Sequence, residues 1–432
     1  MKIVKPSRRS FLKSSALAAT TAAFGTSVPS TVLGANDRIN LAFIGTGGRG
    51  TGLMRGVVSR SVEENVRVAA VCDVFRKRLD QAKEISGGDD YMDYRKVLER
   101  DDIDAVVIAT PDHWHSKMSI DAMDAGKHVY CEKPMTLTCE QAIEVRDAVR
   151  KYNKVMQVGP QRTAQDKWWN ARDMIRDGSL GKVTWAQGSW NRNNRGRSVF
   201  GTSSRRDDPV GPHMTGEGYV DWDMWLGHEW NLAPRLPWHP NRFFYFRGYF
   251  DYNGGVATDL LYHFLAPLQI AIAGENGEYP TRVSAGGGLF DNEDGREVPD
   301  VFMMTADYPS KWTASLESVL TNEHYRPARI YGRYGTMELT ESSSHIDMKA
   351  TKTFEDKFSE MNNGYDHMIV PSEGGRRDMF GNFFDVIRQG GELNCNVDLG
   401  ATTMVAIKMA VESYRRSKTM IWDAEKEVMK EG

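Results

Sequence analysis

The sequence has few cysteines and no cysteine pair. Its 432 residues include four cysteines, none in a CxxC motif: Cys72, Cys131, Cys139 and Cys395. This scarcity excludes a small domain held together by disulfides and a cysteine-based zinc ribbon. Cys72 and Cys131 fall inside apolar, strand-like segments, so we expect buried, unreactive thiols and no metal site.

Long apolar runs and an excess of basic residues are also missing. Beyond the N-terminus no segment approaches the roughly 18 consecutive apolar residues of a spanning helix, so we expect no membrane span. Lys and Arg number 55 against 58 Asp and Glu, and without a basic patch nucleic acid is not an expected partner. The chain is 40% hydrophobic and 26% charged, which is typical of a globular protein long enough for two domains.

Residues 1–34 are typical of an export signal rather than of a folded domain. Arg8 and Arg9 precede Phe11-Leu12-Lys13, and a mild apolar run with small residues follows. A paired arginine, an apolar stretch and small residues in this order predict a twin-arginine signal peptide and a periplasmic or otherwise exported protein. The first folded domain is then expected to begin at residue 35.

Residues 35–160 alternate short apolar segments with helical ones. The apolar segments, rich in β-branched residues, lie at 39–44, 66–73, 105–110, 128–131 and 155–158. Helical patterns occupy 50–60, 75–85, 115–125 and 138–151 between them. Continuous apolar runs of this length are typical of strands buried on both faces. The alternation predicts an α/β domain with a doubly wound, parallel Rossmann sheet.

Residues 161–432 show a different pattern. After a helix expected at 166–176, strand-like segments follow one another without helices, at 282–290, 300–307, 312–320 and 328–334. Helices are expected again at 377–388 and 400–416. Strands at hairpin spacing predict a mostly antiparallel, open sheet, and therefore an α+β second domain.

A glycine-rich loop follows the first expected strand. It reads Gly45-Thr46-Gly47-Gly48-Arg49-Gly50, and Asp73 ends the next strand 23 residues after Gly50. Glycines allow the tight turn and the close approach of backbone to a pyrophosphate, which the helix N-terminus then attracts. A carboxylate at Asp73 accepts hydrogen bonds from ribose hydroxyls and repels a 2′-phosphate, which favours NAD. NADP stays open, because residues 76–78 are all basic.

Three further motifs carry a family resemblance. The third strand runs into Thr110-Pro111-Asp112-His113-Trp114-His115, the fourth into Glu132-Lys133-Pro134, and residues 254–263 read GGVATDLLYH. These are similar to the TPxxxH, EKP and GGxxxDxxxH signatures of the glucose–fructose oxidoreductase / inositol dehydrogenase / MocA (Gfo/Idh/MocA) family. The resemblance covers residues 36–432. It implies an oxidoreductase that acts on a sugar, inositol or related polyol, with a nicotinamide cofactor, in a homo-oligomer (a dimer or tetramer).

The motifs also nominate site residues. Both strand-end motifs fall at the carboxyl edge of the parallel sheet, where ligands bind in such folds. To the glycine loop and Asp73 they add the expected cofactor-binding residues Thr110, Pro111, His115, Glu132 and Lys133. His115 is interpreted as a cofactor-adjacent or capping residue, and His113 as a surface residue.

Lys133, Asp259 and His263 are the expected catalytic residues. Asp259 and His263 are four apart on an expected helix and so share one face. A neighbouring carboxylate fixes the tautomer of a histidine and raises its basicity, as a general base for an alcohol proton requires. Lys133 would stabilise the negative charge that develops on the reacting oxygen. Members of the family divide the proton transfer between the lysine and the histidine differently, so the resemblance leaves open which of the two carries it.

The substrate side is less sharply defined. Twelve of the 34 residues from 219 to 252 are aromatic, which fits core packing, a subunit contact or a wall on which a sugar stacks. Candidate substrate-binding residues are Gln161, Arg162, Arg192 and Arg242, with Arg247 as a further donor.

Two other functions remain open from the sequence. One is a glycosidase-like cycle, in which a sugar hydroxyl is oxidised transiently, the aglycone is eliminated and the hydride returns. The other is a non-catalytic sugar-binding protein, against which the joint presence of Lys133, Asp259 and His263 argues.

An exported enzyme has no evident external supply of NAD, so we expect the cofactor to be tightly bound.

Overall fold

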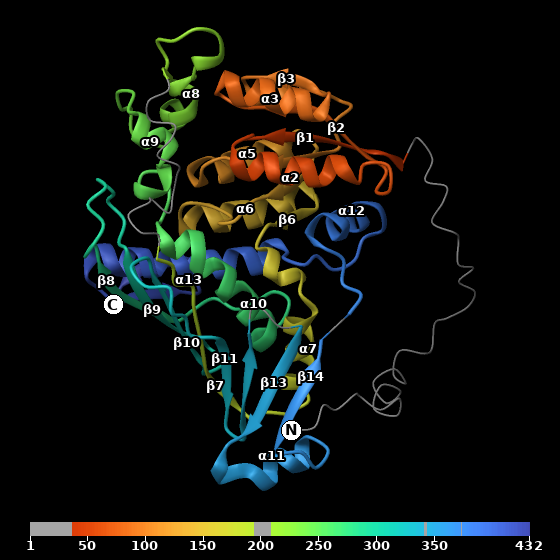
Figure 1. Ribbon diagram of the computed structural model, residues 1–432, viewed down its shortest axis with the longest axis vertical. Coiled ribbons are helices and arrows are strands. Elements are labelled where there is room, and N and C mark those ends of the chain that lie inside the picture. The colour runs from red at the N-terminus through yellow and green to blue at the C-terminus, as the bar shows by residue number, and fades with distance from the viewer. Residues whose placement is uncertain (1–36, 194–208, 341–343, 373) are drawn as a thin grey trace.

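The computed structural model describes residues 37–193, 209–340, 344–372 and 374–432 (Figure 1). The expected signal peptide, residues 1–34, lies outside the described residues. No helix in these described ranges is long and apolar enough to cross a membrane.

The first domain is the expected parallel sheet. Its six strands are β1 (Ile39–Ile44), β2 (Val66–Cys72), β3 (Asp89–Tyr91), β4 (Ala105–Ile108), β5 (His128–Cys131) and β6 (Met156–Val158). They lie in the order β3-β2-β1-β4-β5-β6, and every pairing is parallel. This order places the start of the second half beside β1, which creates the crevice at the carboxyl edge where ligands bind in doubly wound sheets.

Five helices connect these strands. They are α2 (Gly48–Ser59), α3 (Arg76–Ser86), α4 (Tyr94–Leu98), α5 (His115–Asp124) and α6 (Cys139–Tyr152). The start of α6 is a capping box, in which the Thr138 hydroxyl accepts from the Gln141 amide and the Gln141 side chain reaches back to the Thr138 amide. Such a box satisfies two amides that the helix leaves without partners, which explains the sharp start.

The second domain contains a ten-stranded sheet. Its strands are β7 (Val183–Ser189), β8 (Arg282–Gly288), β9 (Val301–Asp307), β10 (Thr313–Val319), β11 (Ala328–Gly332), β12 (Gly335–Leu339), β13 (His345–Ala350), β14 (His367–Pro371), β15 (Met420–Asp423) and β16 (Val428–Glu431). The order is β14-β13-β12-β11-β7-β10-β9-β8-β15-β16, and only the β7–β10 pair among these is parallel. The expected mostly antiparallel sheet is confirmed. The expected strand 328–334 ends at Gly332, because the chain turns there into β12.

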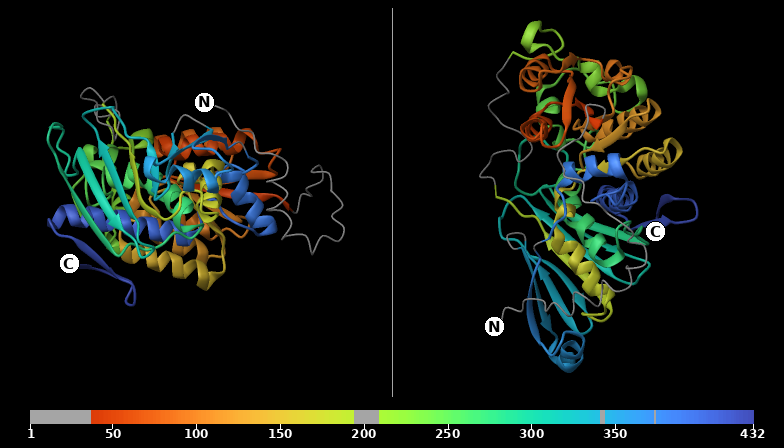
Figure 2. Two further views of the ribbon diagram at one scale, coloured as in Figure 1. Left: turned by 90° about the horizontal axis from the view of Figure 1, so that it is seen from below. Right: turned by 90° about the vertical axis from the view of Figure 1, so that its right-hand side faces the viewer.

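Within the described residues, seven α-helices follow β6 along the chain, and several of them pack on the ten-stranded sheet. They are α7 (Asp166–Arg176), α8 (Trp222–Leu226), α9 (Pro240–Phe244), α10 (Tyr262–Ala273), α11 (Glu355–Met361), α12 (Met379–Gln389) and α13 (Val397–Arg416). In Figure 2 the helices α7 and α10 lie against the sheet on one side. Alternate residues of β9 and β10 are buried, as in a sheet with one packed face.

Helix α13 fixes the two domains relative to each other. It packs against α6 of the first domain and against α10 and β8 of the second (Figure 1). Its residues from Leu399 to Ser413 are all buried. The amide of Val158 in β6 also donates to the carbonyl of Cys395, just before α13. All four cysteines are free and buried, which confirms the expected burial of these thiols.

Candidate active site

The glycine loop joins β1 to α2 through contacts that only glycine allows. Gly45 has φ +85°, and a Cβ on it would lie 2.8 Å from the carbonyl carbon of Ala109 at the end of β4. A Cβ on Gly50 would lie 2.0 Å from the carbonyl oxygen of Gly45. The loop therefore packs directly on its own helix and on β4, and leaves the first amides of α2 facing outward for an anion.

Asp73 holds this loop in place from the end of β2. Its Oδ2 accepts hydrogen bonds from the Thr46 amide at 2.7 Å and the Thr46 hydroxyl at 3.2 Å, and its Oδ1 accepts from the Phe75 amide at 2.9 Å. A carboxylate offers about four acceptor positions, so capacity remains for a ribose hydroxyl. Asp73 thus lines the cavity and also shapes its floor.

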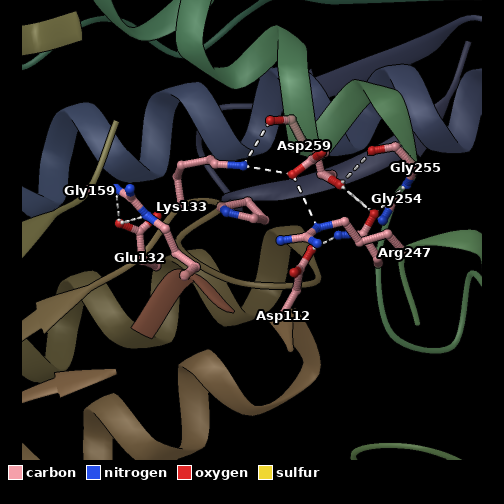
Figure 3. Close-up of polar contacts among 12 residues, drawn as sticks. Asp112, Glu132, Lys133, Gly159, Arg247, Gly254, Gly255 and Asp259 are labelled. Carbon is pink, nitrogen blue, oxygen red and sulfur yellow. Dashed lines mark hydrogen bonds and ion pairs between the residues drawn. The ribbon is translucent and has the colours of Figure 1, made fainter. Parts of the chain in front are cut away.

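Arg49 and Glu132 link the glycine loop to the EKP motif. Arg49 donates from Nη2 at 2.7 Å and from Nε at 3.0 Å to Oε1 of Glu132, which also accepts from Gln161 Nε2 at 3.3 Å (Figure 3). Glu132 is buried, and a buried carboxylate needs such partners. The pair sets the spacing between the start of α2 and the end of β5, where Lys133 follows.

Lys133, Asp259 and Arg247 meet at the centre of the site. Nζ of Lys133 lies 2.8 Å from both the carbonyl oxygen and Oδ1 of Asp259, and Nε of Arg247 lies 3.3 Å from the same Oδ1 (Figure 3). Burial opposes ionisation of Asp259, but the charges of Lys133 and Arg247 outweigh it and hold the pKa of Asp259 below its usual range. The carboxylate is therefore ionised and aims the lysine.

His263 lies in the same cavity, but its pKa differs from the expectation. Burial and then the charge of Lys133 lower the pKa of His263 well below 6.5, and the opposing effect of Asp259 is smaller. Asp259 does raise the pKa of His263, as predicted, but the expected net increase in basicity is wrong, because burial and the charge of Lys133 outweigh it. The imidazole is neutral near pH 7, which is the state that can accept a proton.

The helix that carries these two residues is irregular at its start. Ala257–Leu261 form a π-helical turn, and the α-helix α10 begins only at Tyr262. The expected regular helix through Asp259 and His263 is therefore corrected. Single π-turns within helices are rare and are often found at functional sites.

The two histidines of the TPxxxH segment are buried. His113 is 0% exposed and its Nε2 lies 2.9 Å from the carbonyl oxygen of Trp225, so its interpretation as a surface residue is wrong. The ring nitrogens of His115 lie 2.6 Å from the Pro134 oxygen and 2.9 Å from the Thr110 oxygen. His115 therefore ties the two strand-end loops together, and burial lowers its pKa to about 4.

One cavity of about 510 Å³ joins these groups. Of the expected cofactor residues it is lined by Gly45, Gly47, Gly48, Arg49, Asp73, Thr110, Pro111, Glu132 and Lys133, while Thr46, Gly50 and His115 lie behind the lining. At the other end it reaches Asp259 and His263. The volume is typical of a site for one small ligand or cofactor.

The expected substrate residues divide into two groups. Gln161 and Arg192 line the cavity, as does Arg247. Arg162 does not, because its guanidinium is stacked on the rings of Trp190 and Phe264. Arg242 pairs instead with Asp251 at 2.8 Å and with Glu297 at 3.2 Å, outside the cavity lining.

The rings of the aromatic segment gather mainly at the cofactor end of the cavity, whereas its Arg247 reaches Asp259 at the catalytic end. Phe243 and Phe244 contact Phe75 at centroid distances of 5.7 and 6.4 Å, and the Arg78 guanidinium lies 5.1 Å from the Phe243 centroid. Both phenylalanines line the cavity beside Asp73. Core packing is thus the main role of the segment, since its buried residues form a cluster of their own.

Two residues that line the cavity were not nominated from the sequence. Trp190 follows β7 and its ring lies 5.3 Å from that of His263, so it is the aromatic side chain nearest to the catalytic group among the ring contacts described. Asp112 lines the cavity beside Asp259. Asp112 stood inside a recognised motif, whereas no pattern distinguishes Trp190. No cluster of metal-ligating side chains occurs within the described ranges.

Comparisons with known proteins agree with this architecture. Residues 39–160 match the model of the Gfo/Idh/MocA oxidoreductase family for its NAD-binding Rossmann fold, and residues 212–295 match the model for its C-terminal alpha/beta domain. The first domain is therefore an NAD-binding Rossmann domain. The glycine cradle fits that cofactor, because the loop carries no side chain where a pyrophosphate would approach.

Curated relatives match only part of the chain. An α-N-acetylgalactosaminidase from Shewanella oneidensis is 35% identical over 127 residues, which is 27% of this chain and 27% of the relative. The chain thus matches only about a quarter of the length of such curated relatives.

Two solved structures share the whole fold. An aldose–aldose oxidoreductase from Caulobacter crescentus in complex with glycerol is 20% identical, with a TM-score of 0.63 over 89% of this chain and 99% of that one. A levoglucosan dehydrogenase in complex with NADH and levoglucosan is 18% identical, with a TM-score of 0.62 over 88% of this chain and 98% of that one. At these identities the likeness shows the fold alone.

Proposed function

We propose, since this chain belongs to the Gfo/Idh/MocA oxidoreductase family, that it transfers a hydride between a tightly held nicotinamide cofactor and a sugar, inositol or related polyol. The observation that carries the proposal is the meeting of Lys133, Asp259 and His263 in the cavity that begins at the glycine loop. The levoglucosan bound in one of the solved neighbours supports a carbohydrate substrate. Asp73 supports NAD rather than NADP.

Each catalytic side chain has a distinct task. A bound nicotinamide supplies the hydride acceptor. His263 is neutral and accepts the proton of the reacting hydroxyl, while Lys133 donates to the same oxygen and stabilises its developing charge. Asp259 stays ionised and keeps the Lys133 ammonium in place with two contacts of 2.8 Å.

A panel of free sugars, inositols and glycosides tests the proposal. Purified protein is supplied with NAD, and the near-ultraviolet absorbance of reduced nicotinamide is followed after each addition. A rise with a sugar or polyol that is absent from His263→Ala supports the proposal. No rise with any compound, although NAD binds, would contradict net oxidation of a sugar and leave the glycosidase-like cycle and the non-catalytic sugar-binding alternative.

The acid limb of the pH profile should reveal the environment of His263. Because burial lowers its pKa well below 6.5, the imidazole stays unprotonated and competent as a base to lower pH than an exposed histidine. We expect kcat/KM to fall only below the ordinary imidazole pKa of about 6.5. Rates with a responding sugar between pH 4.5 and 8 measure this limb; a half-maximal point at or above pH 6.5 contradicts the assignment.

The aromatic segment supports retention of the cofactor. Its backbone is hydrogen-bonded to the loop after Asp73, through the Arg76 amide to Tyr219 and the Asp221 amide to Val74. The indole of Trp114 donates to the carbonyl of Trp225 from a second side. The segment that covers the adenosine end of the cavity is therefore held in place by hydrogen bonds to the first domain. Such a cover suits an exported enzyme that recycles its NAD.

Removing one ring of this cover should loosen the cofactor. We expect Phe244→Ala to speed the dissociation of NADH at least about tenfold, because a cavity-lining ring is lost. Phe290→Ala is the control, since that ring is 72% exposed. Stopped-flow fluorescence of NADH release measures both. Equal rates in the two variants would show that Phe244 does not hold the cofactor.

A glycosidase-like cycle is the second candidate. It is favoured by the similarity to the α-N-acetylgalactosaminidase from Shewanella oneidensis, which extends over 127 residues, about the length of the cofactor domain. In this cycle NADH does not accumulate, because the hydride returns to the product. Release of an aglycone from a chromogenic glycoside without net reduction of NAD would support it.

A further inference from the structure

Asp112 is a buried carboxyl in the active-site cavity with no role in the steps above. It begins the short 3₁₀ turn Asp112–Trp114 after β4, is 4% exposed, and lines the cavity. Figure 3 shows it facing Arg247 and Asp259 across the site. A carboxyl in this position is either ionised and paired, or neutral.

The hydrogen-bond network defines how Asp112 is held. Its Oδ2 accepts from Nδ2 of Asn253 at 2.6 Å. Oδ1 of Asn253 accepts from the Gly255 amide at 2.7 Å, and this bond fixes which end of the Asn253 side chain points at Asp112. The contact is therefore a hydrogen bond from the amide of Asn253 to the carboxyl group of Asp112. Asn253 brings no positive charge to the carboxyl group.

The cations near Asp112 are committed to the other carboxylate. Lys133 and Arg247 both pair with Asp259, at 2.8 and 3.3 Å. In the part of the chain that the structure describes, no ion pair includes Asp112. Burial without a paired cation disfavours the charged form, and it raises the pKa of Asp112 to about 8.

The charges around Asp112 change little near neutral pH. The titratable groups that face it or flank it are Lys133, Arg247, Asp259, His263, His113 and His115. Burial lowers the pKa of all three histidines, so they are neutral, and the pKa of Asp259 is held low, so it stays ionised. Asp112 is thus the carboxyl of this group whose charge changes between pH 7 and 9.

We propose that Asp112 is a second acid group of the active site, which keeps its proton at neutral pH and donates it in a hydrogen bond to a hydroxyl or carbonyl oxygen of the bound sugar. The inference rests on the proposed function. Two carboxyls then share the cavity with opposite protonation: Asp259 positions Lys133 as an anion, and Asp112 is a neutral donor. Ionisation of Asp112 removes the donor and adds a second negative charge beside Asp259.

The proton on Asp112 can be tested without any activity. Asp112→Asn keeps the size and a donor but cannot ionise. In the unfolded chain an aspartic acid ionises near pH 3.9, whereas folded Asp112 keeps its proton to about pH 8. The folded state therefore binds more protons in this window, and the wild type loses stability across it as pH rises.

We expect the Tm of Asp112→Asn minus that of the wild type to increase from pH 5 to pH 8 and then to level off. Asp251→Asn is the matched control, because Asp251 pairs with Arg242 outside the cavity lining. Its Tm difference should lack this rise. A flat difference for Asp112→Asn over the same range would overturn the assigned proton.

Kinetics with a sugar that reduces the cofactor test the donated hydrogen bond. We expect wild-type kcat/KM to fall above about pH 8, and Asp112→Asn to lack that fall. At pH 7, Asp112→Ala should lose about 10- to 100-fold and Asp112→Asn clearly less, since only the amide can still donate. Equal losses in both variants would show that the ionised carboxylate is required, and would overturn the proposal. If no sugar reduces the cofactor, the proposed function fails, while the melting series still decides the proton.

Discussion

Replacing Lys133 by methionine should lower kcat by about 10²- to 10⁴-fold, the range in which a positioned proton-transfer group contributes. Methionine has a similar length but no ammonium, so the reacting oxygen loses its donor and its stabilising charge. Arg247 still pairs with Asp259 at 3.3 Å, so the buried carboxylate keeps a cationic partner. The bound NAD should therefore remain, and single-turnover reduction of the cofactor measures the loss.

Lys408→Met separates the chemistry from the loss of a buried ion pair. Lys408 pairs with Glu412 at 3.1 Å, and the side chains are 10% and 9% exposed, close to the 10% and 15% of Lys133 and Asp259. Lys408 does not line the catalytic cavity. The Lys408→Met variant should therefore change the stability of the protein but leave the rate of hydride transfer nearly unaltered. A Lys133→Met enzyme as fast as Lys408→Met would remove Lys133 from the mechanism.

Replacing Gly50 by alanine should strip the protein of its cofactor. The new Cβ would lie 2.0 Å from the carbonyl oxygen of Gly45, which is backbone, so the loop and α2 must move apart. That shift disturbs the amides that receive the pyrophosphate, and overpacking costs about 1–3 kcal/mol in the free energy of unfolding. The nicotinamide released on denaturing the purified variant measures occupancy, and we expect almost none.

Gly52→Ala is the matched control on the same helix. A Cβ at Gly52 meets nothing within 4 Å. In a helix interior alanine is more favourable than glycine by roughly 0.5–1 kcal/mol, so this variant should be slightly more stable and keep the cofactor. Full cofactor occupancy in Gly50→Ala would mean that the close packing of loop and helix is not what forms the binding site.

The cofactor half of the site was predictable because its signals are local. A glycine loop between a buried strand and a helix has few alternative structures, and the structure has Gly45 in a tight turn with positive φ against β4. The strands of the first domain were expected within about two residues of their observed ends, except β3. That strand, Asp89–Tyr91, has only three residues and two acids, so it lacks the apolar run on which the prediction relied.

The catalytic half was predictable in composition but not in electrostatics. Lys133, Asp259 and His263 do share one cavity. The sequence places Asp259 and His263 four residues apart. It cannot show that Lys133, 126 residues before Asp259, forms the ion pair with that carboxylate, or that burial has the largest effect on the pKa of the imidazole. Those outcomes depend on the packing of two domains, which no local pattern encodes.

The aromatic segment shows a different limit. Its aromatic richness was visible, but richness alone does not say which ligand end it covers. The placement follows from a backbone pairing between Phe75 and Val220, which are 145 positions apart. Arg242 illustrates the same point: its partner Glu297 lies 55 positions away, so a residue that seemed suited to substrate is used within the fold.

Isotope transfer tests the central claim most directly. A responding sugar carrying deuterium on the carbon to be oxidised is given to NAD-loaded protein, the reaction is stopped within one turnover, and the released cofactor is weighed by mass spectrometry. Our account predicts that the deuterium is on the reduced nicotinamide, and that Lys133→Met slows its arrival. Deuterium that stays on the sugar or passes to water, while product forms at the normal rate, would contradict hydride transfer to the nicotinamide at this site.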